Sequence, residues 1–331
     1  PGETAYGIAA RYGVSPARLL ADNGLSASDT LAVGQALLVL IPAEVYTVQP
    51  GDTLYSIAGA AGTSVLALVQ NNPYLTDADA LRPGEELVLR YTGDKRRSVY
   101  TTGYAYPYIN RNVLYRALPY LSYLTIFGYG FTETGDLIGI DDVPLIEAAR
   151  AFGAAPVMLL SSITESGNFN SARASRLFND ADLQATVLDN VLATMQQKGY
   201  AGLDIDFEYI DPADREAFVA FVAAAEQKLS PYGYFVNTDL APKTSAAQSG
   251  LLYEAHDYAA LGEASDTLFL MTYEWGYTYG PPLAVAPIDQ VRRVVDYAVS
   301  EIAPAKLLLG IPNYGYDWQL PYEKGVTAAR S

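Results

Sequence analysis

From residue 98 onward the sequence alternates between short apolar runs and longer amphipathic stretches, and this alternation limits the possible folds more than any other feature. The amphipathic stretches include residues 180–198, 211–229 and 288–302, and acidic residues that can cap a helix precede several of them. Seven apolar runs have the length and composition of strands: 99–106, 123–131, 156–161, 202–210, 235–241, 267–275 and 306–314. Repeated β-α units of this kind predict an α/β protein with a parallel sheet.

Seven units between residues 98 and 331 predict a TIM-type (β/α)8 barrel, which needs eight strands and about 250 residues. A doubly wound open sheet is the alternative, but the chain has no Gly-x-Gly-x-x-Gly turn that would favour a nucleotide-binding fold. Only a short segment follows the seventh strand candidate. We therefore expect a barrel that is truncated before strand 8, and an encoded protein that continues through one more β-α unit.

Composition narrows the chemistry that the chain can perform. The absence of cysteine excludes disulfides, thiolate catalysis and cysteine-based metal sites. The only histidine, His256, lies in a helix-like stretch far from any nucleophile signature, and we expect it at the surface or at a helix end. A net charge of −16 disfavours nucleic acid and anionic membranes as partners, and no run of about 20 apolar residues predicts a membrane span. Acid–base chemistry is left to carboxylates and tyrosines.

The run Gly-Leu-Asp-Ile-Asp-Phe-Glu-Tyr-Ile at residues 202–210 carries three acids, Asp204, Asp206 and Glu208, in strict alternation with apolar residues. Such alternation predicts a strand with one apolar face and carboxyl groups about 6–7 Å apart on the other. Like charges that close raise at least one pKa, and a neutral carboxylic acid beside an ionised one can protonate a leaving group near pH 7. The alternative is a solvated edge strand, although Asp is a poor strand former.

Residues 1–41 and 50–90 repeat each other. Pro1-Gly2-Glu3-Thr4 corresponds to Pro50-Gly51-Asp52-Thr53, and Asn23 corresponds to Asn72. Each copy predicts the order strand-helix-helix-strand, with Thr53 and Ser64 as helix caps in the second copy. We expect both copies to close on a short strand, at 37–39 and 87–89, while the first copy lacks its opening strand.

The repeat resembles the LysM module. The resemblance rests on the run that begins Tyr46-Thr47-Val48, on Asn71-Asn72-Pro73 and on the turn Arg82-Pro83-Gly84-Glu85. LysM modules bind glycans that contain N-acetylglucosamine, such as peptidoglycan and chitin. The resemblance implies modules at 1–41, truncated at its start, and at 45–91, with glycan contacts at Gly51, Asp52, Thr53, Asn72 and Pro73. Turn and cap chemistry alone also explains these residues.

The acidic strand resembles the Asp-x-x-Asp-x-Asp-x-Glu motif of family 18 glycoside hydrolases. Asp204, Asp206 and Glu208 occupy its last three acidic positions, whereas Ala201 stands at the first. Residues 271–275 (Met-Thr-Tyr-Glu-Trp) resemble the family's sixth-strand motif, with Glu274 where aspartate is common, and residues 309–315 resemble the seventh. The resemblance covers residues 98–331 and implies the same barrel.

Hydrolysis in that family is substrate-assisted and retaining. The resemblance implies that Glu208 protonates the glycosidic oxygen and later activates water, while Asp206 orients the 2-acetamido group whose oxygen attacks the anomeric carbon. Tyr273 would bond the acetamido group, and Asp204 would tune Asp206, for example by sharing a proton. The expected substrate-binding residues are Glu274, Trp275, Asn313 and Tyr314. No metal or cofactor is expected.

Two LysM-like modules joined to such a barrel resemble the spore-germination hydrolases that degrade spore-cortex peptidoglycan. The expected location is therefore the cell wall, the spore or the extracellular space, although no signal peptide is visible before Pro1. Two alternatives stay open: a chitinase, and an inactive glycan-binding coat protein, which would typically have lost the acid at position 208. Bond preference, endo or exo action and oligomeric state are not specified by the sequence.

Overall fold

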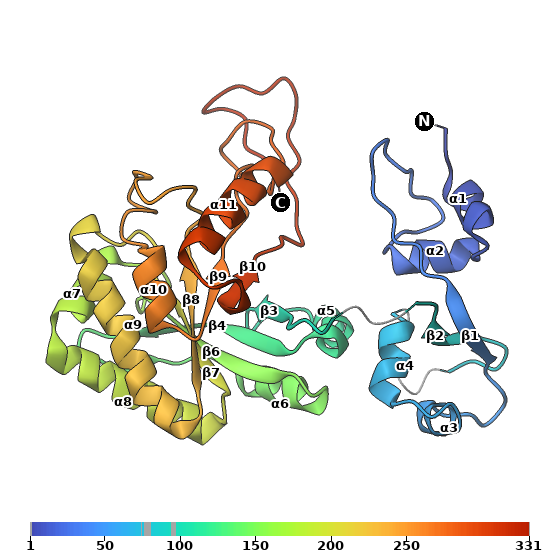
Figure 1. Cartoon of the computed structure of the whole chain (residues 1–331), viewed down its shortest axis with the longest axis horizontal. Helices are drawn as coiled ribbons and strands as arrows, with labels where there is room; N and C mark the ends of the chain where they lie inside the picture. Colours follow the sequence, from blue (N-terminus) through green and yellow to red (C-terminus); the bar gives the residue numbers. More distant parts are fainter. Residues whose placement is uncertain (1, 74, 76–80, 94–96, 331) are drawn as a thin grey trace. The chain divides into compact units, whose positions relative to one another are not determined.

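The computed structural model describes residues 2–73, 75, 81–93 and 97–330 (Figure 1). Pro1, which the repeat pairs with Pro50, lies outside these residues. The chain divides into two compact units. The first comprises Pro1–Gly103, Tyr108–Tyr123 and Ala148–Ala154, and the second comprises Tyr104–Pro107, Leu124–Glu147 and Ala155–Ser331.

The first repeat forms two short helices, α1 (Ala5–Tyr12) and α2 (Pro16–Asp22), around a small apolar core. The Thr4 and Ser15 side chains cap them, as in the second copy. The predicted closing strand at 37–39 is wrong, because these described residues form no strand. The Asn23 amide bonds both the N–H and the C=O of Leu38, as the Asn72 amide bonds those of Val88 in the second repeat.

The second repeat has the predicted order of elements, β1 (Pro42–Thr47), α3 (Leu54–Ala60), α4 (Val65–Asn71) and β2 (Glu86–Tyr91). The two strands pair antiparallel, with Val45 opposite Val88. Thr53 and Ser56 form a reciprocal capping box at the start of α3, which satisfies two N–H groups that the helix cannot. The core beneath the helices includes Leu54, Ile57, Leu68 and Leu87.

The remaining strands form one sheet in the order β10-β9-β8-β7-β6-β4-β3. Their bounds are β3 (Thr102–Ala105), β4 (Tyr123–Phe131), β6 (Ala155–Ser161), β7 (Gly202–Asp206), β8 (Phe235–Leu240), β9 (Thr267–Leu270) and β10 (Leu307–Leu309). The short β5 (Leu137–Ile138) adds an antiparallel edge to β4. Sheet order follows chain order, as in a singly wound barrel, so the doubly wound alternative is wrong. In the described part of the chain, β3 and β10 stand at the two ends of this order.

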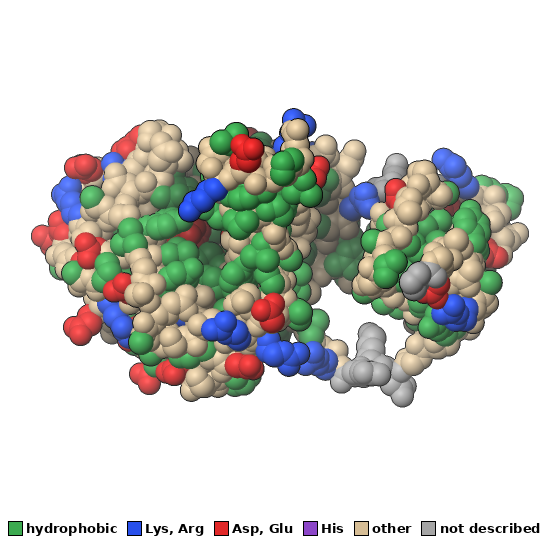
Figure 2. All heavy atoms as spheres, turned by 90° about the horizontal axis from the view of Figure 1, so that it is seen from above, with side chains coloured by type: hydrophobic (Ala, Val, Ile, Leu, Met, Phe, Trp, Pro, Cys, Tyr) green, Lys and Arg blue, Asp and Glu red, His purple; other side chains and the backbone are tan. Residues whose placement is uncertain are grey.

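Helices cover the outer face of the sheet (Figure 1). They are α6 (Val143–Ala151), α7 (Ser171–Asn179), α8 (Ala181–Lys198), α9 (Arg215–Leu229), α10 (Tyr258–Ala264) and α11 (Ile288–Glu301), while α5 (Arg111–Ala117) belongs to the first unit. Short 3-10 turns lie at Leu118–Tyr120, Pro212–Asp214, Ser230–Tyr232 and Pro304–Lys306. Among the described residues, no helix has the length and apolarity needed to cross a bilayer. Lys, Arg, Asp and Glu side chains are interspersed on the face of the molecule in Figure 2.

The apolar face of β7 explains which way its carboxyl groups point. Leu203, Ile205 and Phe207 are buried against the helices, and the Phe207 ring lies 5.3 Å from the Phe178 ring of α7 and 5.8 Å from the Phe221 ring of α9. Because side chains alternate along a strand, the acids between them face the interior of the curled sheet.

Three strands, β7, β9 and β10, end several residues earlier than their sequence pattern predicts, and beyond two of them the backbone turns left-handed. The alternation continues to residue 210, yet β7 ends at Asp206, and Tyr209 has a φ of 54°. Likewise β9 ends at Leu270, and Glu274 has a φ of 67°. Left-handed backbone at residues other than glycine is uncommon and marks places where the chain is held by its surroundings. Glu208 therefore stands two residues beyond the strand, not at its end.

Candidate active site

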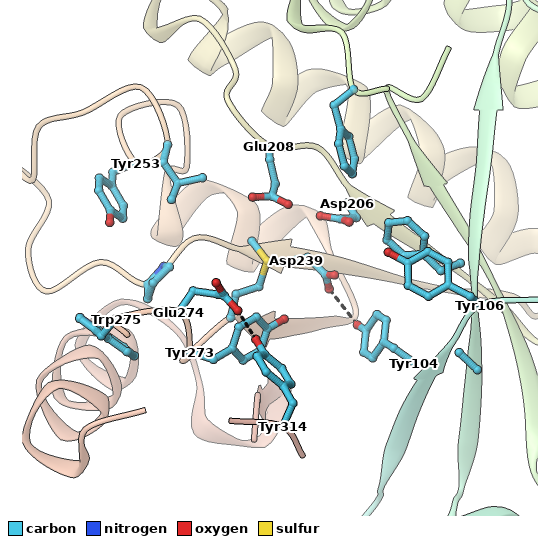
Figure 3. A pocket seen from close by; sticks show the side chains of 16 residues that line it. Tyr104, Tyr106, Asp206, Glu208, Asp239, Tyr253, Tyr273, Glu274, Trp275 and Tyr314 are labelled. Atoms are coloured by element: carbon cyan, nitrogen blue, oxygen red, sulfur yellow. Dashed lines mark hydrogen bonds between the residues drawn. The ribbon is translucent and has the colours of Figure 1, made fainter. Parts of the chain in front are cut away.

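A cavity of about 480 Å³ opens at the carboxyl ends of the strands in the second unit (Figure 3). Its lining comes from β3, β4, β7, β8 and the segments that follow β6, β8, β9 and β10, and it includes Tyr104, Tyr106, Phe127, Phe169, Asp206, Glu208, Asp239, Tyr253, Tyr273, Glu274, Trp275 and Tyr314. This is the edge at which barrel enzymes carry their catalytic groups. The lining contains several carboxyl groups and many aromatic rings, which suits a neutral, ring-shaped ligand with polar substituents.

Asp206 and Glu208 project into this cavity from successive positions of the same face (Figure 3). Asp206 is 5% exposed, and its Oδ1 atom has no hydrogen-bond partner within the described residues. Burial, followed by the charges of Glu208 and Asp204, raises the pKa of Asp206 well above its ordinary value. Burial and the charge of Glu274 also raise the pKa of Glu208. A carboxyl group that keeps its proton near neutral pH is suited to act as a general acid.

Asp204 lies one step deeper and does not line the cavity. Its Oδ2 accepts a 2.7 Å hydrogen bond from the Tyr104 hydroxyl, and its Oδ1 accepts one of 2.6 Å from Asn237 Nδ2. Burial raises the pKa of Asp204, and these hydrogen bonds oppose the rise. Asp204 therefore acts on the site through its neighbours rather than by touching a ligand.

Among the lining residues that sequence reasoning missed, two lie beside the acids of β7: Tyr104 and Asp239. Asp239 belongs to β8 and is 3% exposed. A signal for it was present, because Asn237 and Asp239 occupy alternate positions in 235–241, between Val236, Thr238 and Leu240, which resembles the spacing of the acids of β7. Tyr104 gave no such signal, since its contact with Asp204 joins strands one hundred residues apart in the sequence.

The segment after β9 supplies most of the predicted binding residues. Tyr273 lines the cavity, and burial raises its pKa above the ordinary value. The Glu274 carboxylate accepts hydrogen bonds from the hydroxyls of Tyr314 and Tyr316. Trp275 lines the cavity at the side opposite Tyr106 (Figure 3). The structure thus brings Tyr273, Glu274, Trp275 and Tyr314 to the same cavity as Asp206 and Glu208.

The predictions for two other residues need correction. Asn313 is exposed and does not line the cavity, because β10 ends at Leu309 and the chain leaves the strand direction before residue 313. Asn72 is fully buried in the second repeat, where its amide donates to the carbonyls of Leu68 and Val88 and accepts from the Val88 N–H. These bonds join α4 to β2, so the Asn72 side chain is structural.

The other predicted glycan contacts of the second repeat lie in a turn and at a helix cap. Gly51 has a φ of 88°, which only glycine adopts without strain. The Asp52 carboxylate accepts hydrogen bonds from the Gln49 N–H and the Tyr46 hydroxyl, and Thr53 caps α3. Pro73 follows the end of α4. These contacts fix the shape of the loop.

His256 is buried, so the expectation of a surface position is wrong, whereas the alternative of a helix end fits its place directly before the cap of α10. Residues 251–255 form turns rather than a helix, and α10 begins only after its cap, Asp257. The His256 Nδ1 atom accepts a 3.2 Å hydrogen bond from the N–H of Ala241, directly after β8, and its carbonyl accepts one of 2.9 Å from Lys243 Nζ. Burial and the Lys243 charge lower the pKa of His256 to about 4. His256 is therefore a neutral residue that supports the strand ends beneath the site.

Comparisons with known proteins agree with this geometry. The family described as glycosyl hydrolases family 18 matches residues 98–329, and the LysM domain matches residues 1–39 and 46–90. The cortical fragment-lytic enzyme of Bacillus cereus is 36% identical over 336 residues, which cover 100% of this chain and 77% of that protein. The putative sporulation-specific glycosylase YdhD of Bacillus subtilis is 32% identical, over 99% of this chain and 77% of its own length.

A solved structure extends the similarity to three dimensions. The crystal structure of the spore cortex-lytic enzyme SleL of Bacillus cereus matches with a TM-score of 0.78 and 34% identity, over 99% of this chain and 76% of that one. The chain therefore belongs to glycosyl hydrolases family 18, with LysM domains in its amino-terminal part. It is a glycosidase that acts on glycans containing N-acetylglucosamine.

Proposed function

We propose that this chain hydrolyses spore-cortex peptidoglycan at N-acetylglucosamine residues by a retaining, substrate-assisted reaction. The observation that carries the proposal is the convergence of Asp206 and Glu208 on one cavity, the first with a free oxygen and the second with a raised pKa. The names of the relatives, a cortical fragment-lytic enzyme and a spore cortex-lytic enzyme, support the choice of substrate. In this proposal residues 98–331 are catalytic, and residues 1–41 and 45–91 bind glycan.

The reaction begins with the proton on Glu208. The glycosidic oxygen takes this proton as its bond to the anomeric carbon breaks, and the substrate's acetamido oxygen forms a bond to the same carbon. The nitrogen of the resulting oxazolinium ion carries positive charge, which the Asp206 carboxylate stabilises through the N–H. The Glu208 carboxylate then takes a proton from water, whose oxygen bonds to the anomeric carbon as the bond from that carbon to the acetamido oxygen breaks. Each step inverts the anomeric carbon, so the overall reaction retains its configuration.

The residues after β9 hold the sugar in this proposal. The Tyr273 hydroxyl bonds the acetamido group, the Trp275 ring stacks against a sugar face, and Glu274 and Tyr314 bind hydroxyl groups. Attachment of the LysM domains to the same polymer raises the local concentration of scissile bonds without adding contacts at the catalytic centre. The location that fits this role is the spore or cell wall.

The test is hydrolysis of purified cortex muropeptides, of chitin oligomers and of N-deacetylated chitin oligomers, with the products identified by mass. We expect cleavage after N-acetylglucosamine in muropeptides and no cleavage of deacetylated chains, which lack the internal nucleophile. Preferential cleavage of chitin oligomers would assign a chitinase instead.

The variant Glu208→Gln should lower kcat by at least about 100-fold while glycan binding persists. Glu216→Gln, at an exposed position in the first turn of α9, is the matched control and should keep full activity. If Glu208→Gln retains the activity of the control, Glu208 is not the acid and the chain works by another mechanism. Binding without hydrolysis in the unaltered chain would favour the glycan-binding alternative.

A further inference from the structure

Three buried carboxyl groups lie side by side on β7 and β8, beneath the candidate catalytic acid. Asp204 is 1%, Asp206 5% and Asp239 3% exposed. The parallel register pairs Ile205 with Thr238, so Asp206 and Asp239, the next residues, lie alongside each other on neighbouring strands. Two of the three are residues of the family motif, whereas Asp239 has no part in it.

No cation neutralises this group. Among the ion pairs formed by the described residues, none involves Asp204, Asp206 or Asp239. The titratable groups that face Asp239 are the two acids of β7, Tyr104 of β3 and Tyr273 after β9. Buried carboxylates without a cation are very unfavourable, so protons must neutralise part of their charge.

The hydrogen bonds indicate where one proton resides. The Tyr104 hydroxyl oxygen lies 2.7 Å from Asp204 Oδ2 and 3.0 Å from Asp239 Oδ1, yet a phenol has a single proton to donate. Asn237 Nδ2 already supplies its two protons, to Asp204 Oδ1 at 2.6 Å and to Asp239 Oδ1 at 3.1 Å. If both carboxyls were ionised, a lone pair of Tyr104 would face a carboxylate oxygen. One proton on this pair of carboxyls, shared through the Tyr104 oxygen, satisfies every one of these contacts.

Asp206, in contrast, has no part in this network. Among the described residues, no hydrogen bond joins Asp206 to Asp204; Asp206 lines the cavity, and its buried Oδ1 has no partner. Burial raises the pKa of Asp239 well above its ordinary value, and the charges of Asp204 and Asp206 act in the same direction. These contacts favour a proton shared between Asp204 and Asp239 over one shared between Asp204 and Asp206.

We propose that Asp239 is a positioning residue for the reaction: it carries a proton that it shares with Asp204 and Tyr104, so that Asp206 keeps a free oxygen for the acetamido N–H of the substrate. The catalytic part rests on the proposed function, whereas the shared proton does not. Asp239 touches no reacting atom in this scheme. It acts by neutralising Asp204, which otherwise would attract a proton to Asp206.

The shared proton is tested without substrate, by comparing the pH dependence of unfolding of the full chain with that of Asp239→Asn. An acid that is protonated in the folded state but ionised in the unfolded chain loses stability as pH rises above about 4. The unfolding equilibrium constant of the unaltered chain should therefore rise about tenfold per pH unit relative to Asp239→Asn, until the folded-state pKa is reached. A ratio that stays constant from pH 4 to 7 would overturn the proposal.

Asp142→Asn is the matched control, because Asp142 is also buried but is paired with Lys198 and has a lowered pKa. The unfolding equilibrium constant of the unaltered chain, divided by that of Asp142→Asn, should fall as pH rises toward 4, because the unaltered chain gains stability when Asp142 ionises. The same direction in both variants would show that the measurement follows burial alone, and the shared proton would be rejected.

The positioning role is tested by the pH profile of kcat/KM for Asp239→Asn and Asp239→Ala, with thermal melting to confirm that both fold. The amide of Asn still donates to the Tyr104 oxygen, which leaves the Tyr104 proton on Asp204, so the acidic limb should stay in place. Ala removes the donor, Asp206 then holds its proton more tightly, and the acidic limb should move about one pH unit upward. An unchanged limb in Ala, or equal shifts in both variants, would refute this role. If the unaltered chain does not cleave muropeptides, the proposed function fails, and the unfolding comparison still decides the shared proton.

Discussion

Replacing Lys198 by methionine should destabilise the second unit by about 3 kcal/mol, because it removes the cation from a buried carboxylate. Lys198 Nζ lies 2.6 Å from Asp142 Oδ1 and 2.7 Å from the Tyr129 hydroxyl, and the Asp142 side chain is 0% exposed while that of Lys198 is 25% exposed. Loss of one partner of a buried pair costs about 3–5 kcal/mol. The low end applies here, since Asp142 keeps hydrogen bonds from the hydroxyls of Tyr129 and Tyr200.

Lys228→Met is the control for this measurement. Lys228 pairs with Asp189, but these side chains are 37% and 63% exposed. Such a surface pair contributes at most about 1 kcal/mol. Both lysines lie in helices of the same unit, so the comparison isolates burial.

Tryptophan fluorescence is the assay, because both tryptophans, Trp275 and Trp318, belong to the second unit and report on it alone. At about 2–4 °C per kcal/mol, Lys198→Met should lower the melting temperature by about 6–12 °C, and Lys228→Met by no more than about 4 °C. Burial raises the pKa of Asp142, but the hydrogen bonds from Lys198 and the two tyrosines outweigh it and lower the pKa overall. The stabilisation is therefore present above about pH 4 and lost as pH falls through the folded-state pKa, so the difference between the two variants should shrink there. Equal losses for both lysine variants at pH 7 would refute this reasoning.

Three other predictions follow from buried groups. As pH falls from about 6.5 to 4, the free energy of unfolding should decrease less in His256→Asn than in the unaltered chain, because a buried histidine with a folded-state pKa of about 4 destabilises the folded state over that range. Parallel pH curves from urea denaturation would contradict this. Asn72→Ala should cost the second LysM domain about 1–3 kcal/mol, since the N–H of Val88 loses its acceptor, and hydrogen exchange at Val88 should rise; unaltered protection would exclude a structural role. Glu274→Gln should shift the basic limb of the kcat/KM profile to lower pH, because the charge of Glu274 raises the pKa of Glu208, and an unmoved limb would show that another group sets it.

The fold could be predicted from the sequence because its signals are local. Alternation of apolar and polar residues at 202–210 identifies β7, and apolar runs between amphipathic stretches identify the other strands of the sheet order. The ends of strands were not predicted, because Tyr209 and Glu274 leave the extended backbone under tertiary constraints that no local pattern records. The strand at 37–39 failed for a similar reason: a strand needs a partner strand, and among the described residues none pairs with this segment, although Asn23 holds Leu38 as Asn72 holds Val88.

The site could be predicted only in part. Glu208, Asp206 and Tyr273 belong to motifs, whereas Tyr104 reaches Asp204 through a contact between distant strands. Asp239 could have been found by applying to 235–241 the rule that identified β7. His256 and Asn72 were misread because polar residues near turns are usually exposed, and only the structure shows the backbone groups that they satisfy.

Phe207 stands between Asp206 and Glu208 and packs against Phe178, Phe218 and Phe221 of the surrounding helices. The residue between the two acids is thus part of the hydrophobic interior. A substitution of one of these helix rings would therefore change the orientation of Glu208, although the substituted ring lies far from the cavity. Heat resistance and turnover should consequently vary together when these rings are exchanged. Directed evolution toward either property would therefore have to vary the helix residues that contact Phe207 together with the residues that line the cavity.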